Sequence, residues 1–277
     1  QAGAAGAPPD PKDKIGLLAK LQTAQRLEAE EKFAEAEAAY REVVRDIPDS
    51  PESYVNLALV EARQGAFDRA LETLREGLAR VPDSDALLVR LGHTYLVSGK
   101  PREALETMEK ALVLYPESLD ALTVAAGILD ATGRKPEARA YYERALRVEP
   151  ESRHLRMSLA ANLATTGALE EAIGVYESLI RDFPDEQAFY QYAGIASSLR
   201  NDFARAVSFL RRAVEIAPTP TGAFNLAVAY LKGGDQAKAA EAFRSYLRMF
   251  PKDDARNLAL ARAELERLEK ALGGAPR

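Results

Sequence analysis

The side chains that could perform catalysis or bind a metal are few and far apart in this sequence. His93 and His154 are its two histidines, and neither belongs to a metal-ligand spacing such as His-x-x-x-His. The chain has no cysteine, which excludes disulfides, thiol catalysis and cysteine–metal sites. It also has neither a glycine-rich phosphate loop nor the Gly-x-Ser-x-Gly motif of hydrolases. We therefore expect no catalytic residue, no metal site and no cofactor.

Adjacent carboxylates are the remaining candidates for general acid–base chemistry. Glu170 and Glu171 form such a pair, and we predict that they lie on the outer face of a helix. Nothing in the surrounding sequence predicts a dry pocket that would shift their pKa values. A solvated surface is the favoured interpretation, so the sequence weighs against independent enzymatic activity.

Charge and hydropathy argue against two further kinds of partner. The formal net charge is −5 and the isoelectric point is about 5.4, whereas nucleic-acid binding requires a basic stripe. No run of apolar residues reaches the roughly 18 that a membrane-spanning helix needs. We therefore expect neither nucleic-acid binding nor membrane insertion.

Polar side chains that could hold a peptide are the better candidates for function. Asn56 and Asn225 each carry an amide that both donates and accepts hydrogen bonds, as the backbone of an extended peptide requires. A local structural hydrogen bond would look the same in sequence. Arg90 could pair with an acidic group of a partner. The significance of these residues depends on the elements that position them.

A fixed period organises nearly the whole chain. Prolines recur every 34 residues, with a last interval of 33: Pro48, Pro82, Pro116, Pro150, Pro184, Pro218 and Pro251. One column in the same register is always alanine: Ala36, Ala70, Ala104, Ala138, Ala172, Ala206 and Ala239. A second column is always small: Ala24, Ala58, Gly92, Ala126, Ala160, Gly194 and Ala227. A third is large and apolar: Tyr40, Leu74, Met108, Tyr142, Tyr176, Leu210 and Phe243.

Each period is predicted to form two helices. Apolar residues recur at helical spacing in residues 86–100 and again in 102–114. Gly99 is expected to end the first helix in a left-handed conformation. The other repeats also have glycine at this position, except for Glu31 and Asn201. Proline ends the second helix, and Asp83 or Ser84 can cap the next one. The small columns let the paired helices approach each other while the large column fills the space beside them.

This pattern resembles the tetratricopeptide repeat family over about residues 17–253, most closely in the segment LGHTYL of residues 91–96. The resemblance implies an all-α fold: a right-handed superhelical solenoid of seven helix-turn-helix repeats with a C-terminal capping helix, forming one continuous body. Lys20 and Arg156 replace the large residue that the family has early in the first helix. Those two repeats must fill that corner differently. The expected repeats are residues 17–50, 51–84, 85–118, 119–152, 153–186, 187–220 and 221–253.

In such an array the first helix of each repeat lines the inner wall, so the face turned away from the packing columns becomes the candidate partner-binding groove. This interpretation selects Asn56, Leu59, Arg90, His93, Tyr192 and Asn225. Asn56 and Arg90 resemble part of the family's carboxylate clamp for chaperone C-terminal tails. The clamp is incomplete, because Leu21, Gln25 and Ala86 stand where it needs lysine, asparagine and lysine.

The two ends of the sequence are expected to lie outside the repeats. Residues 1–13 are rich in Ala, Gly and Pro and are predicted to be a linker or tail, with another tail at 273–277. Residues 254–272 form a predicted helix whose apolar stripe covers the last repeat; a weak homodimer through it is the alternative. The first residue is not methionine. Removal of a signal peptide would explain this and would imply a periplasmic protein, and excision from a longer chain would explain it equally. A cytoplasmic location is the other hypothesis.

Two functions are open as hypotheses. The first is a non-catalytic scaffold or adaptor that binds a protein or peptide segment in the groove. The alternative is the C-terminal repeat domain of a larger bacterial enzyme, such as a sulfatase-like hydrolase, where it would position the enzyme or recruit substrate. The segment DPKDKIGLLAKLQ is similar to the stretch of chain after the catalytic domain in some of those proteins.

Overall fold

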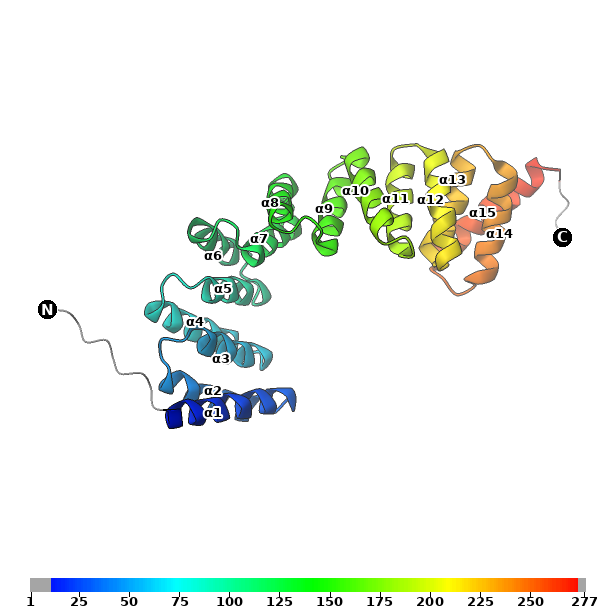
Figure 1. The fold of residues 1–277 in the computed structure, drawn as a ribbon. Helices are drawn as coiled ribbons and strands as arrows, with labels where there is room; N and C mark the ends of the chain where they lie inside the picture. Colours follow the sequence, from blue (N-terminus) through cyan, green and yellow to red (C-terminus); the bar gives the residue numbers. More distant parts are fainter. Residues whose placement is uncertain (1–10, 274–277) are drawn as a thin grey trace. The chain divides into compact units, whose positions relative to one another are not determined.

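The computed structural model describes residues 11–273, and every regular element within them is an α-helix. The helices are α1 (Pro11–Ala29), α2 (Phe33–Asp46), α3 (Pro51–Arg63), α4 (Phe67–Arg80), α5 (Asp85–Val97), α6 (Pro101–Leu114), α7 (Leu119–Ala131), α8 (Lys135–Val148), α9 (Arg153–Thr165), α10 (Leu169–Asp182), α11 (Gln187–Leu199), α12 (Phe203–Ile216), α13 (Pro220–Lys232), α14 (Gln236–Met249) and α15 (Ala255–Ala271). Seven consecutive pairs followed by one further helix are consistent with the seven expected repeats and their cap (Figure 1).

The chain divides into two compact units, residues 1–148 and 149–277, where we expected one continuous body. The described helices are α1–α8 in the first compact unit and α9–α15 in the second. In the first, α3 contacts α5 and α5 contacts α7, so the first helices of successive repeats pack directly on one another. In the second, α11 contacts α13 in the same way.

The paired helices approach each other at the two columns of small residues. Every alanine of these two columns is fully buried. A Cβ atom added to Gly92 would collide with the side chain of Met108, and one added to Gly194 would lie 2.5 Å from Leu210 Cγ. Met108 and Leu210 belong to the large apolar column, so the predicted fit between small and large columns is confirmed.

A second fit joins one residue of the first helix of a repeat to the residue 23 positions later in its second helix, and we call these two residues the corner pair. At Gly77 an added Cβ would lie 2.8 Å from Tyr54 Cγ, so the pair is in direct contact. The sizes of its two members are reciprocal along the chain: Tyr54/Gly77, Leu88/Ala111, Leu122/Ala145, Tyr190/Ala213 and, reversed, Ala223/Tyr246. A large residue on one helix is thus matched by a small one on the other, whichever helix carries it.

Lys20 and Arg156 occupy the first position of the corner pair in the two remaining repeats. Lys20 Nζ lies 2.6 Å from Asp46, and Arg156 forms an ion pair with Asp182. Each acidic partner follows its cation by 26 residues, so both repeats use the same arrangement. An ion pair across the two helices therefore replaces the apolar corner, which answers how these repeats fill it.

The turn between the two helices of a repeat requires a left-handed residue. Gly65, Gly99, Gly133, Gly167 and Gly234 have φ between 75° and 86°, as expected for helix-ending glycines. The two exceptions in the column adopt the same conformation, with φ of 56° at Glu31 and 63° at Asn201. Asparagine tolerates this region better than glutamate does, so Glu31 carries the larger strain.

Three boundaries show how the sequence pattern maps onto helices. The first helices α3, α5, α7, α9 and α11 begin at the first residue of an expected repeat. Helix α13 begins at Pro220, one residue earlier than expected, because the loop between α12 and α13 is the place of the missing residue. Helix α1 begins at Pro11, so residues 11–13 are helical rather than linker; proline is favoured in the first helical turn. Residues 1–10 and 274–277 lie outside the described residues.

Helix caps and the last helix follow the predicted chemistry. Ser84 caps α5 by accepting a hydrogen bond from the Leu87 amide, whereas Asp83 is not the cap. The stripe of α15 buries Leu258, Ala261 and Leu268 in a cluster with Phe243 and Tyr246 of α14. Helix α15 therefore covers the last repeat, and Leu272, the residue that follows it, is exposed.

The fit at Gly77 predicts an unusual response to alanine. Gly77→Ala should lower the free energy of unfolding by about 1–3 kcal/mol, because its Cβ overpacks against Tyr54. Gly174→Ala is the matched control, since that helical glycine has open space around it. The control should raise stability by about 0.5–1 kcal/mol. Urea unfolding followed by circular dichroism measures both, and a stabilising Gly77→Ala would contradict the proposed fit.

At position 31, by contrast, introducing a glycine is expected to stabilise the protein. Glu31→Gly should stabilise the protein by about 1 kcal/mol, because glycine adopts φ of 56° without the clash that a Cβ creates. Gly65→Glu, the reverse exchange one repeat later, should destabilise by a similar amount. Thermal unfolding of the two variants checks the sign, and two changes of the same sign would be inconsistent with the backbone explanation.

Candidate functional site

Two neighbouring first helices, α3 and α5, form a hollow on the face that we predicted to bind a partner. We call it the α3–α5 hollow, and its volume is about 230 Å³. Its lining residues are Leu59, Ala62, Arg63, Phe67, Arg90, His93, Thr94 and Val97. Three of the six predicted groove residues, Leu59, Arg90 and His93, are therefore brought together. The repeat positions them, because each lies on the side of its helix away from the packing columns.

The floor and the rim of this hollow differ in character. Leu59, Ala62, Phe67 and Val97 supply an apolar lining, and Val97 is about half exposed at 49%. The Thr94 hydroxyl, although it lines the hollow, donates to the Arg90 carbonyl oxygen at 2.8 Å within α5. An apolar side chain of a partner would therefore bury surface here without leaving a hydroxyl unpaired.

The charges at the rim are not balanced. Arg63 Nη1 lies 3.4 Å from Glu28 Oε1 of α1, so this cation has a counter-charge. The guanidinium of Arg90 has no ion-pair partner among the side chains of residues 16–273, which the structure describes. Burial lowers the pKa of His93, and the charge of Arg90 lowers that pKa further. His93 is thus kept neutral at neutral pH, and Arg90 supplies the uncompensated charge at the rim.

The other predicted groove residues lie elsewhere. Asn56 is half buried on α3, one turn before Leu59, and does not line the hollow. Its amide has no hydrogen-bond partner within the described part of the chain. Tyr192 and Asn225 belong to the second compact unit, on the contacting helices α11 and α13. The six residues are therefore divided between the two compact units.

Tyr192 has a defined role in its own compact unit. Its ring stacks on Tyr176 of α10, with centroids 5.9 Å apart and planes inclined by 21°. Burial, together with the neighbouring Tyr192, raises the pKa of Tyr176 to about 12. Tyr192 itself is 40% exposed, so one part of its ring packs while the rest stays open to solvent. Beside it, Gln191 accepts hydrogen bonds from Gln187 and from Thr219, the cap of α13.

The sequence also places Arg63 and Val97 on the exposed face of their helices, but sequence reasoning missed three other residues that line the α3–α5 hollow. Ala62 and Thr94 lie on the first helices but were not assigned to the exposed face. Phe67 is the first residue of α4, a second helix, whereas we assigned the groove to first helices alone. The sequence did contain a signal for Phe67: a large apolar residue stands at the start of a helix, where a solvent-exposed residue would be expected.

Three further features bear on other kinds of function: the pair of adjacent carboxylates, groups that could bind a metal, and helices that could cross a membrane. Glu170 lies 2.8 Å from Arg200 and 3.0 Å from Arg205, in an exposed ion-pair cluster. No group of three or more His, Asp or Glu side chains in the described residues is placed to hold a metal ion. Within residues 11–273 no helix combines the length and the apolar character needed to cross a membrane.

The fold and the exposed face define a class of protein: an all-helical repeat protein built from antiparallel pairs that cross at small residues. Comparisons with known families agree. A family model described as Tetratricopeptide repeat matches residues 21–85, 89–147, 128–187, 159–221 and 200–254, and a second with the same description matches 61–112. The chain belongs to the tetratricopeptide repeat family.

Solved structures of tetratricopeptide repeat proteins share the fold. One from Parabacteroides merdae has a TM-score of 0.58 at 18% identity and covers 91% of this chain and 98% of its own. The C-terminal part of a repeat-containing protein from Cytophaga hutchinsonii reaches 0.71 at 16% identity, with 86% and 98% covered. YrrB, described as having an unusual peptide-binding site, gives 0.57 at 22% identity, covering 65% and 93%. No curated protein matches the sequence.

The rim charges make a prediction about His93. Arg90→Gln should raise the pKa of His93, because it removes the neighbouring positive charge that disfavours the imidazolium. The wild-type pKa of His93 should lie below the usual value for histidine. His154, the second histidine of the chain, is exposed on α9. NMR titration of the two imidazole Cε1 protons measures this, with His154 as the internal control. An unchanged His93 pKa would show that the two side chains do not interact.

Proposed function

We propose that this protein is a non-catalytic scaffold that binds a peptide or protein segment across the face formed by its first helices. The α3–α5 hollow is the observation that carries the proposal, because it joins an apolar floor to an uncompensated cation. Membership of a repeat family whose fold serves as an interaction scaffold supports it. The peptide-binding site in the description of YrrB belongs to that protein and serves here as an analogy.

The chemistry of the hollow specifies one feature of the ligand. A large apolar side chain fills the space over Leu59, Phe67 and Val97, and a neighbouring carboxylate pairs with Arg90. A charge-assisted hydrogen bond from a guanidinium is stronger than one between neutral groups, so the carboxylate orients the segment. Asn56 lies one turn away and holds the peptide backbone through its free amide. Tyr192 and Asn225 offer similar chemistry in the second compact unit.

A peptide selection tests this proposal without knowledge of the natural partner. The immobilised protein is used to select from a random-peptide phage library, and selected peptides should place an apolar residue beside Asp or Glu. Asn56→Ala combined with Arg90→Ala should weaken their binding about tenfold or more, as the loss of a hydrogen bond to a charged group implies. Isothermal titration calorimetry measures the affinity, and circular dichroism confirms that the helices remain.

The matched control removes charge from the opposite layer. Arg102→Ala with Glu106→Ala alters two exposed residues of α6, a second helix, and should leave the affinity unchanged. If the Asn56 and Arg90 double variant binds the selected peptides as tightly as the wild type, the proposed surface is wrong.

A further inference from the structure

Two buried carboxylates lie where the repeat pattern calls mostly for apolar residues. Glu61 is 1% exposed, and the corresponding residues of the other repeats are Leu27, Tyr95, Leu129, Leu163, Ser197 and Tyr230. Glu37 is 8% exposed, and its counterparts are Leu71, Leu105, Arg139, Ile173, Val207 and Ala240. Burying a carboxylate is costly unless it is paired and hydrogen-bonded. The partners of these two groups therefore decide whether the first repeat stays in place.

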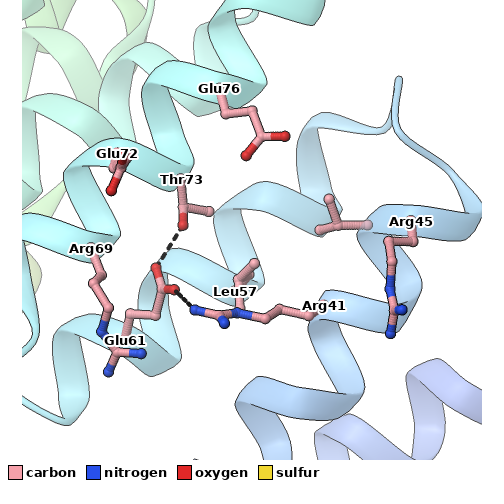
Figure 2. A pocket seen from close by; sticks show the side chains of 9 residues that line it. Arg41, Arg45, Leu57, Glu61, Arg69, Glu72, Thr73 and Glu76 are labelled. Carbon is pink, nitrogen blue, oxygen red and sulfur yellow. Dashed lines mark hydrogen bonds and ion pairs between the residues drawn. The ribbon is translucent and has the colours of Figure 1, made fainter.

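One arginine bridges the two carboxylates. Arg41 Nη2 lies 2.8 Å from Glu37 Oε1 and 3.2 Å from Glu61 Oε1. Glu61 also accepts from the Thr73 hydroxyl at 2.8 Å, as Figure 2 shows. Glu37 accepts from Gln64 Nε2 at 2.7 Å and from Arg69 Nη1 at 2.5 Å. The network thus joins α2 of the first repeat to α3 and α4 of the second.

This network is reachable by solvent although its carboxylates are buried. Arg41 and Arg69 are 51% and 48% exposed at their side chains. Glu61 lines a second hollow of about 400 Å³ between α2 and α4, which we call the α2–α4 hollow. Protons can therefore reach Glu61 without unfolding of the helices around it.

Other charged groups around Glu61 do not replace this pairing. The α2–α4 hollow also contains Arg45 of α2 together with Glu72 and Glu76 of α4, all on its exposed rim (Figure 2). From α1, Glu28 pairs with Arg63. From α5, Arg90 and His93 face the α3–α5 hollow instead. The charge balance at the two buried carboxylates thus rests on Arg41 and Arg69.

An apolar cluster also joins the first repeat to the second. The cluster contains Ala24, Ala36 and Tyr40, which pack against Leu57 and Val60 of α3. Tyr40 also donates to Glu28 at 2.9 Å, and Lys20 replaces the apolar corner with an ion pair. The strained Glu31 lies in its turn. These three features lie within the first repeat, so its attachment to α3 and α4 combines the apolar cluster with the carboxylate network.

We propose that α1 and α2 form a detachable end of the first compact unit, and that the charge state of Glu37 and Glu61 controls their attachment to α3 and α4. With both carboxylates ionised, Arg41 and Arg69 hold α2 in place. Protonation removes the negative charges, and the arginines then gain more from water than from the junction. Attachment is thus weakened as pH falls. Detachment uncovers Leu57 and Val60, which become an acid-exposed apolar surface on α3.

A cysteine reporter measures detachment directly, because the chain has no natural cysteine. Val60→Cys places a single thiol on the covered face of α3, where the valine is fully buried. Ile128→Cys, on α7 of the same compact unit and 1% exposed, is the control position. In each background Glu37→Gln with Glu61→Gln imitates the protonated state at neutral pH. We expect thiol labelling at position 60 to become about tenfold to hundredfold faster, as loss of charged hydrogen bonds implies, and labelling at 128 to stay slow.

Two further measurements separate local detachment from general instability. Hydrogen exchange of the unmodified protein, corrected for intrinsic rates and followed as the pH is lowered stepwise from 7, should show α1 and α2 losing protection at a higher pH than the other helices of the first compact unit. Helices α5–α8 should keep theirs. Glu177→Gln, which removes an ion pair with Arg205 in the second compact unit, should leave α1 and α2 unchanged.

The proposal fails on either of two results. Equal acceleration of labelling at positions 60 and 128 would show that the network stabilises the whole compact unit rather than one end. Loss of protection in α1 and α2 only together with α5–α8, at whatever acid pH this occurs, would show that their attachment does not depend on these carboxylates. The pH measurement needs no substitution, so it decides the question even if the glutamine variants do not fold.

Discussion

The close approach of two helices at small side chains is the constraint on which the rest of this structure depends. Each repeat brings its first and second helices together where alanine or glycine leaves no bulk, and every alanine of these columns is fully buried. Larger residues beside the crossing, such as Met108 and Leu210, fill the remaining space. Because this fit fixes which side of each first helix is covered, it also fixes the side that stays open for a partner.

Much of the fold could be predicted because its constraints recur at a fixed spacing. The five first helices from α3 to α11 begin at the first residue of an expected repeat, since proline and capping residues mark each boundary locally. The division into two compact units was not predictable in the same way. It depends on packing in three dimensions, whereas the columns of the repeat read alike on both sides of residue 148.

The candidate site was predicted in part, for a related reason. Leu59, Arg90 and His93 meet in one hollow because periodicity tells which face of a helix is exposed. Phe67 was missed because it comes from the turn into a second helix, which the periodicity of the first does not reach. Glu37 and Glu61 were visible only as exceptions in largely apolar columns, and their pairing through Arg41 requires two helices, α2 and α3, to be placed in space.

The reversal of the corner pair in the last repeat has a consequence for how such arrays change during evolution. Tyr54 faces Gly77 in the second repeat, whereas Ala223 and Tyr246 exchange the large and small roles in the seventh. A genetic crossover that joined the first helix of one to the second helix of the other would place two tyrosines, or glycine and alanine, at the same corner. Crossovers in the loops between repeats preserve each fit. Duplication and shuffling of this array are therefore constrained to whole helix pairs.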